Sequence, residues 1–256
     1  MSRRKHPRKF RATFENGGFW DYYKDLERQF ENFLDHVPYI DRNERVCSFR
    51  LVNLLLSIGG HVDSAFKEMA GYQGFSKNKK CKEIRRKVKE SRKRIRLSEK
   101  PITVSIGESL SAFEELYELS KNEVIFKRLP EREMIVPFDP HNPKTNAPRW
   151  WDIYNGIKHD FSNAFENANL LVTRNALAGA FLLNVIHKPG ILRLNDHGIL
   201  KWPPQPIEGE FAGDFDHALV RIPQDILEDM LKRNQILWGF VETPLFIYDY
   251  YQAAED

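Results

Sequence analysis

A cluster of aromatic and ionisable residues occupies the stretch RWWDIYNGIKHD at positions 149–160. Asn155 and His159 are four positions apart, so on a helix both side chains would project from one face. They could form a reactive pair, or a buried hydrogen-bonded pair that holds two helices in register. Trp150 and Trp151 could stack on nucleic-acid bases, or pack over the core as an anchor for the helix. The cluster therefore predicts either an anchored helix start or a functional site.

A second candidate is the basic segment 77–100, which holds thirteen Lys and Arg residues against three Glu residues. This segment carries +10 and residues 1–12 carry +6, so the rest of the chain carries −13 for a total of +3. Such charge separation favours contact with a polyanion or an acidic partner, although charge runs are also common on solvated faces. The nucleic-acid-binding residues expected from these segments are Lys82, Arg85, Arg86, Lys89, Arg92, Lys93, Arg96 and Arg149.

Other polar residues have weaker signals. His61 and Asp63 could complete a polar site against His159, or belong to the core, while His141 and His187 look like caps or surface residues near helix ends. The sequence contains no HExxH, P-loop, GxGxxG, GxSxG or zinc-finger spacing. The usual support for metalloproteases, nucleotide hydrolases, dinucleotide oxidoreductases and α/β-hydrolases is therefore missing, and we expect neither metal nor cofactor.

Composition and patterning predict a mostly α-helical globular fold. The chain has 256 residues, of which 41% are hydrophobic and 29% charged. The pair Gly59 and Gly60 interrupts one helical pattern and predicts close approach of another backbone. Apolar residues at three- and four-residue intervals predict helices at 19–37, 45–70, 77–97, 105–119 and from 148 to about 188, with a break near Asp160.

The flanking segments differ in character. We expect residues 1–17 to form a flexible basic arm, residues 18–190 a helical domain, and residues 191–256 a small mixed α/β appendage. Scattered prolines predict an irregular excursion over 123–148. The appendage should contain a hairpin in ILRLNDHGILKW, a WPPQP linker, a strand in ALVRI, a helix from Pro223 and strands in LWGFVETPLFIYDYY.

The sequence also contains signals that bear on the cellular location of the protein. Its longest apolar run, at 176–186, is shorter than the ~18 residues of a membrane span. The basic N-terminus has no apolar region behind it, as a secretory signal would. Cys47 and Cys81 form no CxxC, so both are expected to be apolar fillers in a reducing environment. A cytoplasmic location without membrane association is the expectation.

The pattern P-x-W-W-x-x-Y-N-x-x-K-H-D resembles the all-α HEPN superfamily, and in particular a bacterial branch of uncharacterised HEPN-like proteins. The segment 48–70 resembles the paired core helix of that family, and the resemblance extends over residues 45–190. It implies an antiparallel helical bundle. The matching residues are Pro148, Trp150, Trp151, Tyr154, Asn155, Lys158, His159, Asp160, Ala168, Asn169, Asn175 to Ala178 and Phe181 to Leu183.

The resemblance implies a homodimeric, metal-independent ribonuclease, or an RNA-binding relative, in antiviral defence or a toxin–antitoxin system with a partner protein. His159 would then act as general acid or base, because a histidine takes up and releases protons near neutral pH. Asn155 would orient the RNA, and Lys158, with Arg149 or arginines of the helix at 85–96, would hold phosphate. Tyr154 stands where the family has an arginine and cannot replace its bidentate phosphate contact.

Two alternatives therefore stay open beside an enzyme. One is a catalytically inactive HEPN-like module whose aromatic and polar cluster stabilises the fold. The other is a nucleic-acid-binding adaptor that works through the basic helix at 77–100.

Overall fold

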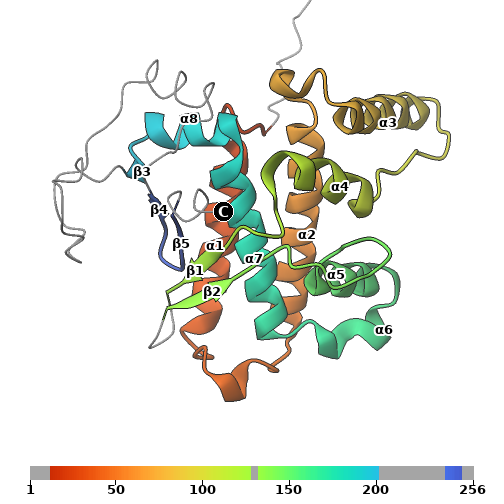
Figure 1. Cartoon of the computed structure of the whole chain (residues 1–256). Coiled ribbons are helices and arrows are strands. Elements are labelled where there is room, and N and C mark those ends of the chain that lie inside the picture. The colour runs from red at the N-terminus through yellow and green to blue at the C-terminus, as the bar shows by residue number, and fades with distance from the viewer. Residues whose placement is uncertain (1–11, 128–131, 202–239, 250–256) are drawn as a thin grey trace, which may run out of the picture.

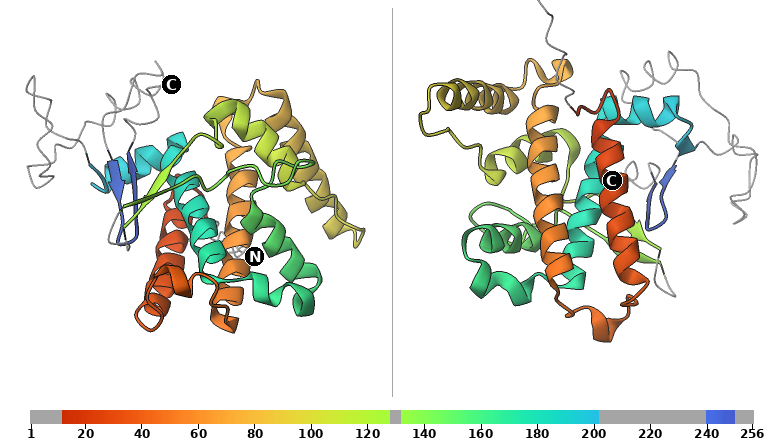
Figure 2. Two further views of the ribbon diagram at one scale, coloured as in Figure 1. Left: turned by 60° about the horizontal axis from the view of Figure 1, so that its bottom comes forward. Right: turned by 180° about the vertical axis from the view of Figure 1, so that it is seen from behind.

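The computed structural model describes residues 12–127, 132–201 and 240–249. This part of the chain is mostly helical, with a small antiparallel sheet on one side of the helices (Figure 1). Three long helices, α1 (Gly18–Leu34), α2 (Phe49–Met69) and α7 (Leu170–Ile186), contact one another at the centre of the molecule. Helix α1 runs opposite to α2 and α7 (Figures 1 and 2).

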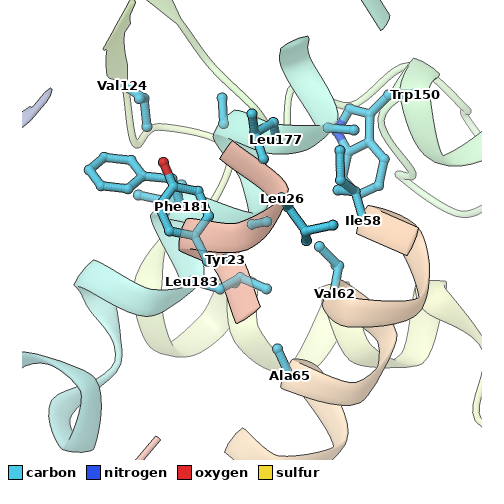
Figure 3. Close-up of a cluster of buried hydrophobic side chains, with 14 of the residues drawn as sticks. Tyr23, Leu26, Ile58, Val62, Ala65, Val124, Trp150, Leu177, Phe181 and Leu183 are labelled. Carbon is cyan, nitrogen blue, oxygen red and sulfur yellow. The ribbon is translucent and has the colours of Figure 1, made fainter. Parts of the chain in front are cut away.

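The hydrophobic core lies between these three helices (Figure 3). Tyr23 and Leu26 of α1, Ile58 of α2 and Phe181 of α7 are all fully buried. Burial of a side chain of this size contributes about 1.5–3 kcal/mol to stability. Helix α7 is buried on nearly every side, and most of its residues are apolar. Its N-terminus is capped by the Asn169 side chain, which accepts from the Val172 N–H at 3.1 Å.

Helix α2 begins later than the sequence pattern predicts. Its N-cap is Ser48, whose hydroxyl accepts from the Leu51 N–H at 3.2 Å. Phe49, an apolar residue of the helix predicted at 45–70, is 69% exposed and lies in the first turn of α2, outside the core. Its ring packs instead against those of Phe161 and Phe165.

The predicted hairpin at 191–202 is wrong, because the described structure has helix α8 (Lys188–Asp196) there, bent by 81° from α7. Pro189 lies in its first turn, where a missing N–H costs nothing. The Asn-Asp-His-Gly sequence forms the C-terminal cap. Gly198 has a φ of +67°, and the Ile199 N–H donates to the Leu194 carbonyl at 2.9 Å, which is the Schellman arrangement.

The sheet has five strands within the described residues, in the order β2-β1-β5-β4-β3, with every neighbouring pair antiparallel. Part of the span predicted to be irregular is thus regular, since it supplies β1 and β2. The predicted ALVRI strand, WPPQP linker and helix from Pro223 lie outside the described residues. The strands are β1 (Val124–Phe126), β2 (Glu133–Ile135), β3 (Leu200–Lys201), β4 (Phe240–Glu242) and β5 (Phe246–Asp249).

The strands near the C-terminus pack directly on the helical core. Glu27 of α1 is 2% exposed and accepts hydrogen bonds from the Thr243 hydroxyl at 2.5 Å and the Leu245 N–H at 3.1 Å. Phe246 stacks on Phe181 of α7 with ring centroids 5.7 Å apart. Strand β5 also pairs with β1, so segments on both sides of residue 190 share one sheet and one core.

The remaining helices lie around one end and one side of this core. Helix α3 lies at the edge of the molecule (Figures 1 and 2). It buries only Cys81 and Ile84, chiefly against α4, and its later Ile95 is 59% exposed. No residue in the second half of α3 is buried, so this half of the helix is open to solvent. These elements are α3 (Lys79–Arg96), α4 (Ile106–Tyr117), α5 (Arg149–His159) and α6 (Phe161–Ala164), with 3₁₀ turns at Asp41–Asn43, Gln73–Phe75 and Phe165–Asn167.

Candidate nucleic-acid interface

The tryptophan pair anchors α5 in the core. Trp150 is 2% exposed and Trp151 4% exposed, so neither presents a ring face to a base. The Trp150 indole N–H donates to the Pro137 carbonyl at 2.7 Å, and its ring lies against Phe138. Between the two interpretations of these residues, the structure supports the packing role. The helix breaks at Asp160, as the sequence predicts.

The ring of Tyr154 packs closely against Gly59 of α2. A Cβ added at Gly59 would lie 2.5 Å from Cε2 and 2.6 Å from Cγ of Tyr154, so only a glycine lets the ring approach this closely. The predicted close contact thus exists, but it is made by an aromatic ring and not by a backbone. Tyr154 is 7% exposed, and burial, together with the Asp63 carboxylate, raises its pKa. Its phenol stays neutral near pH 7 and packs against the core.

One face of α5 opens into a groove, here called the Asn155 groove, with a volume of about 500 Å³. Asn155 and Lys158 line it together with Arg92 of α3. Lys67 of α2 also lines it and pairs with Asp63. The groove is therefore lined by three predicted site residues of α5, which are Tyr154, Asn155 and Lys158, and by one predicted cation of α3, which is Arg92. The other lining residues are Val88, Ser91, Trp151 and the segment 101–106.

His159 and Arg149 lie elsewhere on α5. His159 is exposed at the C-terminal end of the helix and is not among the residues that line the Asn155 groove. Arg149 lines a separate cavity of about 450 Å³ with His141, Asp152 and Asp160. The structure therefore does not bring Arg149 to Asn155 and Lys158. These two residues lie six and nine positions farther along the helix, which at 3.6 residues per turn places them on a different face from Arg149.

The residues suggested on α2 separate in the same way. Asp63 lines the Asn155 groove, whereas His61 is 2% exposed and packs against Phe19 and Tyr22 of α1. Burial lowers the His61 pKa to about 4, and neither ring nitrogen has a hydrogen-bond partner in the described structure. His61 is thus a neutral core residue and does not complete a site with His159.

A larger groove, here called the α3 groove, has a volume of about 1140 Å³. It is lined by the side of α3 that faces the C-terminal end of α2, and it shares Lys67, Val88 and Arg92 with the Asn155 groove. Its basic residues are Lys67, Arg85, Arg86, Lys89, Arg92, Lys93 and Arg96, against the acidic residues Glu15, Glu68 and Glu90. Of the expected nucleic-acid-binding residues on α3, Lys82 alone lines neither groove.

Most of these cations have no counter-charge. Arg86 donates two hydrogen bonds to Glu83, at 2.8 and 2.6 Å, and Lys87 pairs with Glu108. By contrast, Arg85, Lys89, Arg92, Lys93 and Arg96 form no ion pair within residues 12–127, 132–201 and 240–249. Unpaired, solvated cations that line two connected grooves favour phosphate binding over a purely structural role.

Nothing in the sequence places His187 in a site. It lies at a helix end, as expected, since it links α7 to α8, yet it is 1% exposed and lines the α3 groove with Phe14, Tyr72 and Pro189. Phe14, inside the expected flexible arm, is also buried. These residues come from segments far apart in the chain, so no local motif could reveal them.

Searches with models of protein families, among curated proteins and among solved structures gave no match. Among the described helices, no single one combines the length and apolar character needed to cross a membrane. The described residues also contain no group of three or more His, Cys, Asp or Glu side chains placed to hold a metal ion.

Proposed function

We propose that this protein binds RNA through α3 and the two grooves beside it. The observation that carries the proposal is the set of unpaired cations of α3 that line these grooves, since they offer phosphate contacts without the loss of internal ion pairs. The acidic remainder of the molecule adds support, because it repels a polyanion from other surfaces and orients it toward α3.

RNA is favoured over other polyanions by the resemblance of α5 to the HEPN motif. Asn155 and Lys158, which carry part of that motif, line a groove with Arg92 of α3. A phosphate backbone on α3 would therefore reach the motif residues directly. The HEPN-like bundle, a homodimer, a defence or antitoxin partner and a cytoplasmic setting belong to the same proposal.

The test is a comparison of two double variants with equal change of charge. Lys89→Glu with Arg92→Glu removes two groove cations, whereas Arg45→Glu with Arg50→Glu changes exposed residues at the opposite end of α2. We expect the α3 variant to bind a fluorescent RNA at least tenfold more weakly than the wild type, and the α2 variant to bind nearly as the wild type does. Equal affinities for all three proteins would refute the proposal, and DNA of the same length tests the preference for RNA.

RNA cleavage is a second candidate, favoured by the exposed imidazole of His159 beside Lys158. The side chain of a histidine can transfer protons to and from a ribose hydroxyl. Incubation of a structured RNA with the wild type and with His159→Ala tests this role. Loss of RNA with the wild type alone supports cleavage. Equal loss with both proteins would rule out His159 as the catalytic residue, and no loss with either would leave a binding protein without nuclease activity.

A further inference from the structure

The α3 groove has a second kind of wall besides its cations. Phe14, Tyr72, His187 and Pro189 line it, and they come from the segment before α1, the segment after α2 and the start of α8. Helices α3 and α8 lie on opposite sides of the C-terminal end of α2 (Figures 1 and 2). The groove is thus bounded by cations from one direction and by rings from another.

The ring wall is rigid because it rests on a continuous aromatic cluster. His187 makes edge contacts with Phe14 at 4.7 Å and with Tyr72 at 5.3 Å, measured between ring centroids. Behind Tyr72, Phe75 packs on His187 at 6.0 Å and on Phe113 at 6.3 Å. A wall fixed in this way loses little side-chain freedom when a flat ligand binds.

His187 is held as a neutral hydrogen-bond donor. Burial lowers its pKa to about 3, so the imidazole carries no charge near pH 7. Its Nδ1 lies 2.8 Å from the Tyr117 hydroxyl, which accepts from the backbone N–H of Lys188. The hydroxyl proton is therefore directed to Nδ1, and the remaining ring proton resides on Nε2. The wall combines aromatic surface with one neutral N–H donor.

These features together fit a ligand that carries both phosphate and a flat, polar ring. We propose that the α3 groove holds one unpaired base of a single-stranded RNA, with Arg85, Lys89 and Arg92 on the flanking phosphates. The partly exposed ring of Tyr72, which the buried His187 supports from behind, would lie against the base. The inference rests on the RNA-binding function proposed above and adds the form of the strand. A volume of about 1140 Å³ is ample, since pockets of about 300–1,000 Å³ hold small-molecule ligands.

The decisive experiment uses the unaltered protein and two oligomers of equal charge, an oligouridine and an abasic strand of the same length. Base stacking on aromatic side chains predicts binding of the abasic strand that is about 5- to 150-fold weaker. An RNA duplex of the same phosphate number should also bind more weakly than the oligouridine. Equal affinity for the oligouridine and the abasic strand would overturn the inference.

Two variants of Tyr72 test whether its ring contacts the base. Tyr72→Leu should reduce the preference for the oligouridine over the abasic strand, and Tyr72→Phe, which keeps the ring, should retain it. Tyr22→Leu changes a 44% exposed tyrosine on α1 and serves as the control. A full preference in folded Tyr72→Leu would contradict the site. If Lys89→Glu with Arg92→Glu abolishes binding while the oligouridine and abasic strand bind the wild type equally, the base site fails and the RNA-binding function stands.

Discussion

The contact between Gly59 and Tyr154 can be tested with its neighbour, Gly60, as an internal control. A Cβ at Gly59 would lie 2.5 Å from Cε2 of Tyr154, whereas a Cβ at Gly60 would meet nothing within 4 Å. Replacement of a glycine by alanine inside a helix gains about 1 kcal/mol of stability when the added methyl group finds space. Gly60→Ala should therefore stabilise the protein by about 1 kcal/mol.

Gly59→Ala gains the same helix propensity but forces the Tyr154 ring to move. Overpacking of a filled core costs about 1–3 kcal/mol, so the net effect is a loss of up to about 2 kcal/mol. The two variants should thus differ by about 1–3 kcal/mol in the free energy of unfolding. In a protein of this size each kcal/mol shifts the melting temperature by about 2–4 °C. Urea denaturation at pH 7 gives the free energies, and thermal melting gives an independent ranking.

A variant that lacks the Tyr154 ring supplies the decisive control. In a Tyr154→Ala background the obstacle is gone, and Gly59→Ala should then stabilise the protein as Gly60→Ala does. Equal stabilisation by both alanines in the wild-type background would refute the reasoning, because Tyr154 could not then lie against α2.

Three further predictions concern the fold that positions the site. Burial raises the pKa of the Glu27 carboxyl group above its ordinary value of 4.5. The protonated carboxyl group therefore contributes its full stability below pH 4.5, and this contribution is lost as the pH rises through the raised pKa of the folded protein. The stability advantage of Glu27→Gln over the wild type should therefore grow between pH 4 and pH 7 in urea titrations, and a constant difference would be contrary evidence. Gly198→Ala should cost about 1–2 kcal/mol, because alanine resists the positive φ of the α8 cap, and circular dichroism melting measures it. Trp150→Phe should cost about 1–3 kcal/mol in the same assay, since it leaves the buried Pro137 carbonyl unpaired, and an unchanged melting temperature would count against that hydrogen bond.

The sequence predicts the helical part of the fold well, since helices α1 to α5 follow from apolar residues at three- and four-residue spacing. The break at Asp160 was also predictable. The segment around Gly198 was misjudged because Asn-Asp-His-Gly suits a hairpin turn as well as a helix C-cap, and only tertiary packing of α8 decides between them.

The candidate site was also predictable only in part. The basic helix is evident from composition, and the shared helix of Asn155 and Lys158 follows from their spacing. Local spacing could not reveal that Arg92 of α3 lines the same groove as these residues, nor that His187 and Tyr72 line a second groove. Those neighbours arise from long-range packing between elements far apart in the sequence, for which a single sequence carries no signal.

The salt dependence of RNA binding tests the central claim most directly. For a single strand, the logarithm of the binding constant falls with the logarithm of salt concentration, with a slope of about −0.7 for each neutralised phosphate. If the unpaired cations Arg85, Lys89, Arg92, Lys93 and Arg96 each contact one phosphate, the slope is about −3.5. Loss of Lys89 and Arg92 as cations should then reduce its magnitude by about 1.4. A slope near zero, or one left unchanged by that double variant, would contradict RNA binding at α3.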